Sequence, residues 1–158
     1  MRVYTFFGLL MLSLALGGAG AVAMKKLLSW RMLPSAPCSS VIENGDFIGD
    51  DMQRYAFNGT VTFWLDERMI SIFGVTESAQ QGKKKLRRVL HMSQVSSSGP
   101  VVTGKVVEIK VSPSDDVGGS STLFSARDES INLVFRRLRA QMYLVTVNDN
   151  WIMMCEEK

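Results

Sequence analysis

The fold class is decided by residues 57–75, which read FNGTVTFWLDERMISIFGV. Apolar and polar side chains alternate along the first part of this stretch, with Val61 and Phe63 on one side. Ile70 and Ile72 repeat the alternation after the short polar stretch DER. A period of two places successive side chains on opposite faces of a strand, so the stretch predicts an antiparallel hairpin.

Further alternating stretches follow toward the C-terminus. They cover residues 86–92, 101–111, 131–137, 143–147 and 151–155. The alternation groups Val107, Ile109 and Val111 on one face, and the polar residues 148–150 predict the turn of a last hairpin. Residues 128–142 fit a short helix as well as a strand. The pattern predicts a mainly β domain of about seven strands, as a small antiparallel sandwich or a partly open barrel.

The N-terminus is strongly apolar. Between Arg2 and Lys25 the chain has 22 residues and no charge. A helix rising about 1.5 Å per residue would span roughly 33 Å over this length, which is enough to cross a bilayer core. We therefore predict a transmembrane signal anchor over residues 1–24. A signal peptide cleaved after Ala23 and a buried soluble helix are the alternatives, the first because Ala21-Val22-Ala23 has the small-x-small form.

The segment after the anchor is predicted to be a juxtamembrane stalk over residues 25–37. Pro34 and Pro37 oppose a continued helix, and Asn44-Gly45 is typical of a turn. The β-rich domain is therefore expected to begin near Cys38 and to cover residues 38–158.

The orientation of the anchor has arguments on both sides. Lys25, Lys26 and Arg31 follow the apolar segment and only Arg2 precedes it, which favours a cytoplasmic C-terminal domain. The short N-terminal tail and the cysteines favour the opposite orientation, and long domains cross largely regardless of charge. We expect a single-pass protein of the bacterial inner membrane with its C-terminal domain in the periplasm, and the reverse orientation stays open.

Small residues recur at every fourth position in the apolar segment. Ser13, Gly17 and Ala21 form one such stripe, against which another helix can pack closely. A partner membrane protein or a second copy of the chain would fit there. The alternative is that Gly and Ala are simply common in such segments.

The two cysteines are Cys38 and Cys155. A bridge between them would close almost the whole domain into one loop and, by the loop-entropy model, contribute about 4 to 5 kcal/mol less any strain. It would require an oxidising compartment such as the bacterial periplasm. Two buried free thiols are the alternative.

A basic run stands out in the middle of the chain. It comprises Lys83, Lys84, Lys85, Arg87 and Arg88. We expect it to contact anionic headgroups or an acidic partner surface, or else to be a solvated hairpin end. The net charge of +3 does not indicate a nucleic-acid partner.

Catalytic and cofactor motifs are missing from the sequence. His91 is the only histidine, and GxSxG, GxxxxGK[ST], GxGxxG and HExxH do not occur. Asp115-Asp116 lacks the acid spacing of a calcium loop. We expect no enzyme activity, no metal and no organic cofactor.

The order of these pieces resembles the FidL-like family of enterobacterial inner-membrane proteins. The resemblance rests on the apolar N-terminus, Cys38, the stretches FNGTVTF (57–63) and ISIFG (70–74), LRRV (86–89), YLVTVN (143–148) and Cys155. It implies a membrane-anchored protein that is often encoded beside a membrane-spanning winged-helix transcription regulator and serves as its periplasmic companion. The family carries no established site residues, so none is transferred.

Three functions therefore compete. The first is a non-enzymatic accessory protein that stabilises or tunes the membrane-bound regulator. The second is a secreted or periplasmic β-domain that binds a small apolar ligand in a roomy interior. The third is an anchored hydrolase, which would need His91 within hydrogen-bond reach of a serine and an acid.

Overall fold

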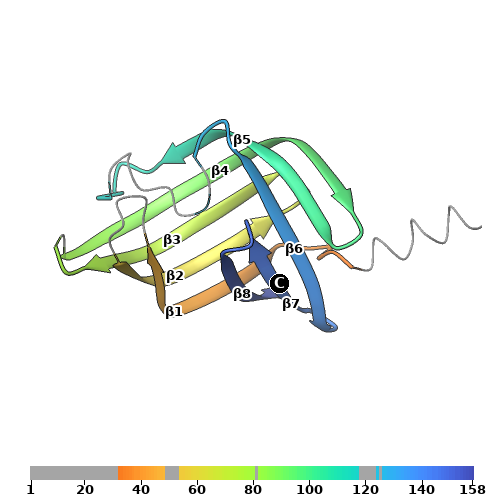
Figure 1. Cartoon of the computed structure of the whole chain (residues 1–158), viewed down its shortest axis with the longest axis horizontal. Coiled ribbons are helices and arrows are strands. Elements are labelled where there is room, and N and C mark those ends of the chain that lie inside the picture. Colours follow the sequence, from red (N-terminus) through yellow and green to blue (C-terminus); the bar gives the residue numbers. More distant parts are fainter. Residues whose placement is uncertain (1–31, 49–53, 81, 118–123, 125) are drawn as a thin grey trace, which may run out of the picture.

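The described part of the protein is a closed antiparallel β-barrel (Figure 1). The computed structural model describes residues 32–48, 54–80, 82–117, 124 and 126–158. Eight strands follow one another around the barrel in chain order. They are β1 (Cys38–Ile48), β2 (Arg54–Trp64), β3 (Met69–Ser78), β4 (Gly82–Ser98), β5 (Val101–Val111), β6 (Ser130–Arg139), β7 (Met142–Val147) and β8 (Trp151–Glu157).

The predicted β class and antiparallel pairing are confirmed, and the architecture is sharpened. The structure shows a closed barrel in place of a sandwich or a partly open barrel. The predicted anchor, residues 1–24, and its stripe of Ser13, Gly17 and Ala21 lie outside the described residues. Within the part of the chain that the structure describes, no helix could span a bilayer.

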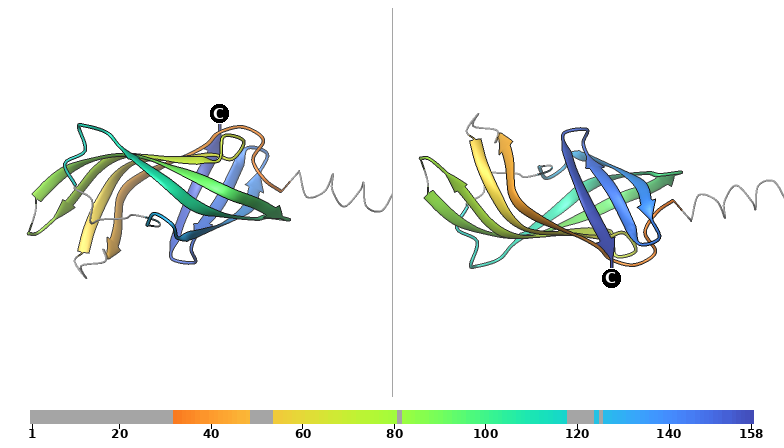
Figure 2. Two further views of the ribbon diagram at one scale, coloured as in Figure 1. Left: turned by 90° about the horizontal axis from the view of Figure 1, so that it is seen from above. Right: turned by 90° about the horizontal axis from the view of Figure 1, so that it is seen from below.

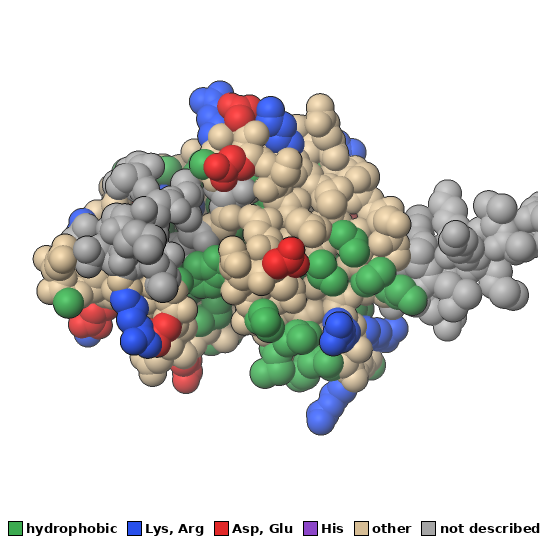
Figure 3. Space-filling model, in the orientation of Figure 1, with side chains coloured by type: hydrophobic (Ala, Val, Ile, Leu, Met, Phe, Trp, Pro, Cys, Tyr) green, Lys and Arg blue, Asp and Glu red, His purple; other side chains and the backbone are tan. Residues whose placement is uncertain are grey.

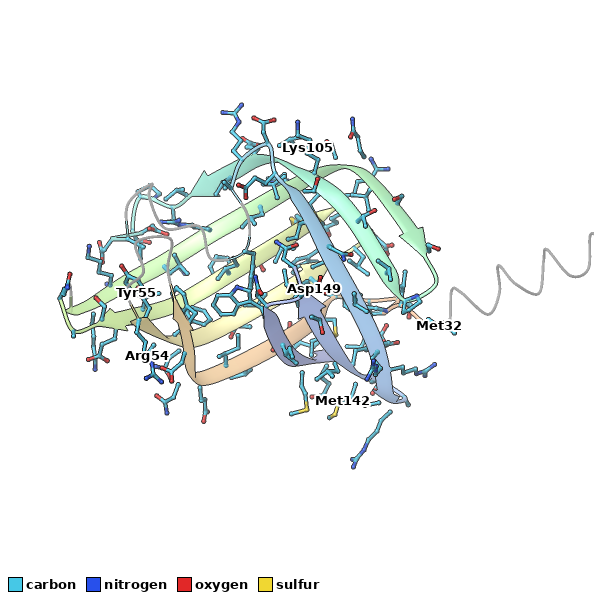
Figure 4. The ribbon with its side chains drawn as sticks, viewed as in Figure 1. Met32, Arg54, Tyr55, Lys105, Met142 and Asp149 are labelled. Atoms are coloured by element: carbon cyan, nitrogen blue, oxygen red, sulfur yellow. A yellow bond between two sulfur atoms is a disulfide. The ribbon has the colours of Figure 1, made fainter. Side chains whose placement is uncertain are left out.

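The barrel has two ends, which all views separate clearly (Figures 1 and 2). The near end holds Met32 and the β2–β3 and β4–β5 turns, and Figure 4 labels Met32 there. The far end holds the β3–β4 turn, at the opposite limit of the molecule. Strands β2, β3 and β4 run between the two ends and form the longest continuous part of the sheet.

Both predicted hairpins are present. Trp64 pairs with Met69 across the β2–β3 turn, and Val147 pairs with Trp151 across the β7–β8 turn. In the second turn, Asn148 has a φ of 48° and Asp149 a φ of 59°. Short polar side chains tolerate this left-handed conformation, as the sequence predicted.

Strand β1 was missed because Asn44-Gly45 was interpreted as a turn. Glu43 and Asn44 instead form a bulge inside the strand, because the pairing with β2 shifts between Ile42 and Gly45. Asn44 has a φ of 53°, the left-handed conformation that asparagine tolerates. An Asn-Gly pair, which is typical of turns that reverse the chain, here lies at a bulge that bends the strand.

The helix considered for residues 128–142 is wrong. This segment contains β6, in which Ile131, Leu133 and Phe135 alternate into the core and are at most 1% exposed. The period of two decides the structure because each inward side chain fills the barrel interior.

A uniform alternation does not hold along β5. Val102 and Val106 are the buried residues of this strand, whereas Val107 and Val111 are exposed and Ile109 is half-buried. The pairing with β4 shifts between His91 and Met92, opposite Val107. A bulge changes the phase of the alternation, and a uniform period of two across 101–111 could not anticipate it.

Phe57 fills a corner of the barrel between two facing glycines. Gly59 and Gly74 pair across β2 and β3. A Cβ on Gly59 would lie 2.7 Å from the Phe57 ring, and one on Gly74 would lie 2.6 Å from it. The ring takes the place of two missing side chains and covers the backbone where the sheet curves.

Aromatic side chains occupy much of the remaining interior. Phe47 stacks on Tyr55 with ring centroids 5.2 Å apart and lies 5.1 Å from Trp151. Phe63 meets Phe135 edge-on at 5.7 Å. The inside of the barrel is therefore a packed core, as is common when eight strands close.

Candidate interaction surfaces

The barrel closes through a short seam between its first and last strands. Cys38↔Glu157 and Ser39↔Glu156 are the ladder pairs of β1 with β8. The Ser40 hydroxyl donates a further hydrogen bond of 2.6 Å to the carbonyl of Met154 on β8. Few backbone bonds therefore hold this junction.

The predicted disulfide is confirmed and lies at this seam. Cys38 on β1 and Cys155 on β8 are bonded, with Cα atoms 5.4 Å apart and a separation of 117 positions in the sequence. Both residues are buried, at 0% and 1% exposed. The covalent bond stabilises the part of the barrel that has the fewest ladder pairs.

Residues 35–37, which precede β1, are hydrogen-bonded to the end of β8 at the same seam, and we call these contacts the Glu157 latch. The Glu157 carboxylate accepts hydrogen bonds from the Ser35 amide, from the Ser35 hydroxyl at 2.9 Å and from the Ala36 amide at 2.9 Å. The Lys158 amide donates to the carbonyl of Pro37 at 3.1 Å. The last residues of the predicted stalk therefore lie against the near end of the barrel.

The electrostatics of Glu157 reflect these contacts. Burial alone would raise its pKa, but hydrogen bonds from Ser35 and Ala36 and the charge of Arg137 outweigh burial and lower the pKa below its ordinary value. Burial and the charge of Glu157 raise the pKa of the neighbouring Tyr143. The latch is thus strongest with Glu157 ionised.

Two small cavities border the incoming chain at the near end. Their volumes are about 210 and 350 Å³, and both are lined by Pro34, Ser35, Leu65 and Asp66. The larger also touches Val102. The apolar-ligand hypothesis expected a roomy interior, and these cavities instead lie at the mouth of a barrel whose interior is filled by side chains.

The basic run starts beside the β3–β4 turn and continues inside β4 as part of that strand. The strand divides it between two faces: Lys83, Lys85 and Arg87 are exposed, whereas Lys84 is half-buried and Arg88 is 5% exposed. The outward residues Lys83, Lys85 and Arg87 form what we call the basic face.

The basic face includes an exposed aromatic ring. The Arg87 guanidinium lies 5.7 Å from the centroid of Phe73 on β3, a cation–π contact. Phe73 is 44% exposed. Lys83 lies 3.7 Å from Glu77 at the far end of the same hairpin.

Arg88 has a separate, structural role. Its guanidinium donates to both carboxylate oxygens of Asp115, at 3.0 and 3.1 Å. The Asp115 carboxylate also accepts from the amides of Arg87, at 2.8 Å, and Val117, at 3.0 Å, and its side chain is 0% exposed. The pair fastens the loop after β5 to β4.

The charge of Asp115 is stabilised by this set of donors. Burial alone would raise its pKa, yet the hydrogen bonds from Arg88 and from the two backbone amides outweigh burial and lower the pKa. No signal in the sequence connects Asp115 with Arg88, because the two residues meet only when the loop returns to β4.

An apolar surface lies on the outside of β7, β8 and β1 (Figure 3, lower centre). Ile152 is 68%, Met154 60% and Val41 71% exposed, and Leu144 pairs with Met154 across β7 and β8. We call these four residues, with Met142 beside them, the outer apolar face. It was not predicted, although the alternation in 151–155 already placed Ile152 and Met154 opposite Met153.

Within the described ranges, His91 and the acidic residues form no recognised site. His91 lies on β4 opposite Met69 and Glu108, and in the described residues it makes no hydrogen bond to a serine or an acid. In the same part of the chain, no three His, Cys, Asp or Glu residues are grouped as metal ligands.

Comparisons of the chain with protein-family models, with curated proteins and with solved structures found no match.

Proposed function

We propose that this protein is a membrane-anchored, non-enzymatic accessory protein whose barrel lies in the periplasm. It acts as the companion of a membrane-spanning winged-helix transcription regulator. The observation that supports this most strongly is the Cys38–Cys155 disulfide at the seam of the barrel. The resemblance to the FidL-like family supplies the class of partner.

The way in which the barrel closes supports an oxidising compartment. Two ladder pairs join β1 and β8, so a reducing environment would leave the closure to few bonds. The uncharged stretch of 22 residues ends eight positions before Met32. A membrane anchor over this stretch agrees with its length, and a periplasmic barrel agrees with a closure that depends on the disulfide.

The basic face is our proposed contact with the regulator. Lys83, Lys85 and Arg87 are exposed along the first part of β4, which starts at the β3–β4 turn, and this turn lies at the end of the barrel opposite Met32 (Figures 1 and 4). If the anchor enters the bilayer beside the near end, the bilayer is remote from the β3–β4 turn at which the basic face begins. An acidic surface on the partner therefore fits better than headgroups of that bilayer.

The compartment is tested by thiol labelling in intact cells with a membrane-impermeant maleimide. We expect labelling of Cys38 and Cys155 only after reduction, which leaves the seam to two ladder pairs and so lets the reagent reach the buried thiols. The labelling is read as a mass shift on the full-length protein. Free thiols that react only after lysis would place the barrel in the cytoplasm and refute the proposal.

The partner contact is tested by charge reversal of the basic face. Lys83→Glu with Lys85→Glu should lower the amount of regulator that co-purifies from membranes and lower its steady-state level. The matched control is Lys105→Glu with Arg127→Glu, which makes the same change in net charge on other exposed positions. Equal effects of the two pairs would contradict the assignment of the basic face.

A further inference from the structure

The outer apolar face brings exposed apolar side chains from three strands together, and among the described residues none covers it. Its side chains lie on adjacent strands, with Leu144 opposite Met154 and Thr146 opposite Ile152. The register of β1 with β8, continued by two positions, places Val41 beside Met154, and the Ser40 hydroxyl bonded to the Met154 carbonyl holds the strands together there. Contiguous apolar patches on small soluble domains commonly mark interaction sites.

The charges beside this face are arranged asymmetrically. On the β6 side, Arg136 pairs with Leu144 and Arg139 with Met142, and both arginines are exposed. On the opposite side, Glu156 of β8 pairs with Met142, and Glu43 of β1 is exposed. One margin is therefore basic and the other acidic, with apolar side chains between them.

This arrangement distinguishes among the candidate occupants. An anionic lipid surface, or an acidic protein surface, would attract the arginines but meet Glu43 and Glu156 at the other margin. A second copy related by a two-fold axis that runs parallel to the strands of this face places the basic margin of each molecule over the acidic margin of the other. Two-fold interfaces use one patch on both subunits, so the patch must complement itself.

We propose that the outer apolar face is the interface of a homodimer, with Leu144, Ile152 and Met154 at its centre. The arginines of β6 face the partner copy's acidic margin. The inference does not depend on the proposed regulator, because it involves only this chain.

The proximity of two copies at the outer apolar face is tested with Ile152→Cys in the full-length protein, in membranes. A short bismaleimide that reacts with free thiols serves as the cross-linker. The matched control is Val111→Cys, at a position that is 48% exposed on β5. We expect a covalent dimer with Ile152→Cys and none with Val111→Cys. Cross-linking to a protein of another size, or protection of the introduced thiol only in anionic vesicles, would identify a different occupant and overturn the proposal.

The charge arrangement is tested by reversing one margin at a time. Arg136→Glu with Arg139→Glu makes both margins acidic, and Glu43→Arg with Glu156→Arg makes both basic. Each variant alone should lose self-association by about tenfold or more, because like charges then face each other twice. Thermal melting and an intact disulfide verify that each variant is folded.

Mixing the two variants gives the decisive readout. Co-expressed with different tags, the all-acidic and all-basic faces should associate with each other and form mixed dimers, recovered by cross-linking after Ile152→Cys is added to both. Failure of the mixture to associate, or unchanged self-association of either variant, would overturn the proposal. This outcome is separate from that of the regulator experiment, whose substitutions lie on β4.

Discussion

The β1–β8 seam and the β2–β3–β4 sheet are held together in different ways. β2 and β3 pair along almost their full lengths, and β3 pairs along its whole length with the first part of β4, Gly82 to His91. The seam has two ladder pairs, one disulfide and the Glu157 latch. Backbone hydrogen bonding spread over long strands stabilises the first region, whereas side-chain chemistry concentrated at a few residues stabilises the second. Changes at the seam are therefore expected to act locally, and the covalent bond should contribute most there.

The largest effect is expected from removing the disulfide. Cys38→Ser with Cys155→Ser should lower the free energy of unfolding by about 4 kcal/mol, because the unfolded chain regains the entropy of a very long loop. Urea unfolding followed by tryptophan fluorescence measures this, and reduced wild-type protein should behave like the variant. An unchanged midpoint would contradict the role of the bond in closure.

Hydrogen exchange on the same variant measures the local stability of the β1–β8 seam separately from that of the β2–β3–β4 sheet. Amides of β1 and β8 should exchange faster, whereas those of β2 and β3 should keep their protection at conditions where the barrel remains folded. Uniform loss of protection would show that the seam and the long sheet unfold as one unit.

The second largest effect is expected at the buried pair on β4. Arg88→Met leaves the Asp115 carboxylate buried without its cation, so the free energy of unfolding should fall by about 3 kcal/mol. Arg54→Met is the control, since the Arg54–Asp46 pair is exposed at the surface and solvent screens it, so its loss should change stability far less. Chemical denaturation of both variants makes the measurement, and equal losses would argue against the role of the buried pair.

A smaller effect is expected at the glycine corner of β2 and β3. Gly74→Val would force side-chain atoms into the Phe57 ring and the backbone opposite, at a cost of about 2 kcal/mol. Gly104→Ala should cost less, because its Cβ would lie 3.3 Å from a Val95 methyl group that can move. Thermal melting ranks the two variants, and the reverse order would argue against the corner.

The smallest effect is expected from Glu157→Gln. The folded pKa of Glu157 is lowered, so its charge contributes stability above the unfolded pKa of about 4.3 and loses it as pH falls through the folded value. Because solvent screens part of this charge, the variant should be less stable at pH 7 by no more than about 1 kcal/mol. The difference between the two proteins should shrink toward zero in acid, and a difference that grows in acid would contradict the latch.

Local pattern was sufficient wherever a strand keeps a regular alternation. The sequence predicted the β2–β3 and β7–β8 hairpins and the inward row of β6. A period of two in a sheet places alternate side chains on opposite faces, so it has a single interpretation. Prediction failed where a bulge shifts that period, at Asn44 and at Val107. Bulges depend on how two paired strands fit, and a single strand's sequence does not carry that information.

The interaction surfaces show the same limit. The basic run was visible in the sequence, but its division into an exposed set and the buried Arg88 depends on strand phase and on Asp115 returning from a distant loop. The outer apolar face joins Leu144, Ile152, Met154 and Val41, which are contributed by three strands. Their adjacency arises only when β1 meets β8.

The sequence alone determined that this protein is mainly β and antiparallel, that an uncharged stretch precedes the domain, and that two cysteines are placed to join its ends. Composition and short-range periodicity carry these properties. Only the tertiary structure decided that the strands close into a barrel, which side chains remain outside it, and which charges meet. Closure pairs the first strand with the last, and contacts between residues so far apart in the chain leave no local trace in the sequence.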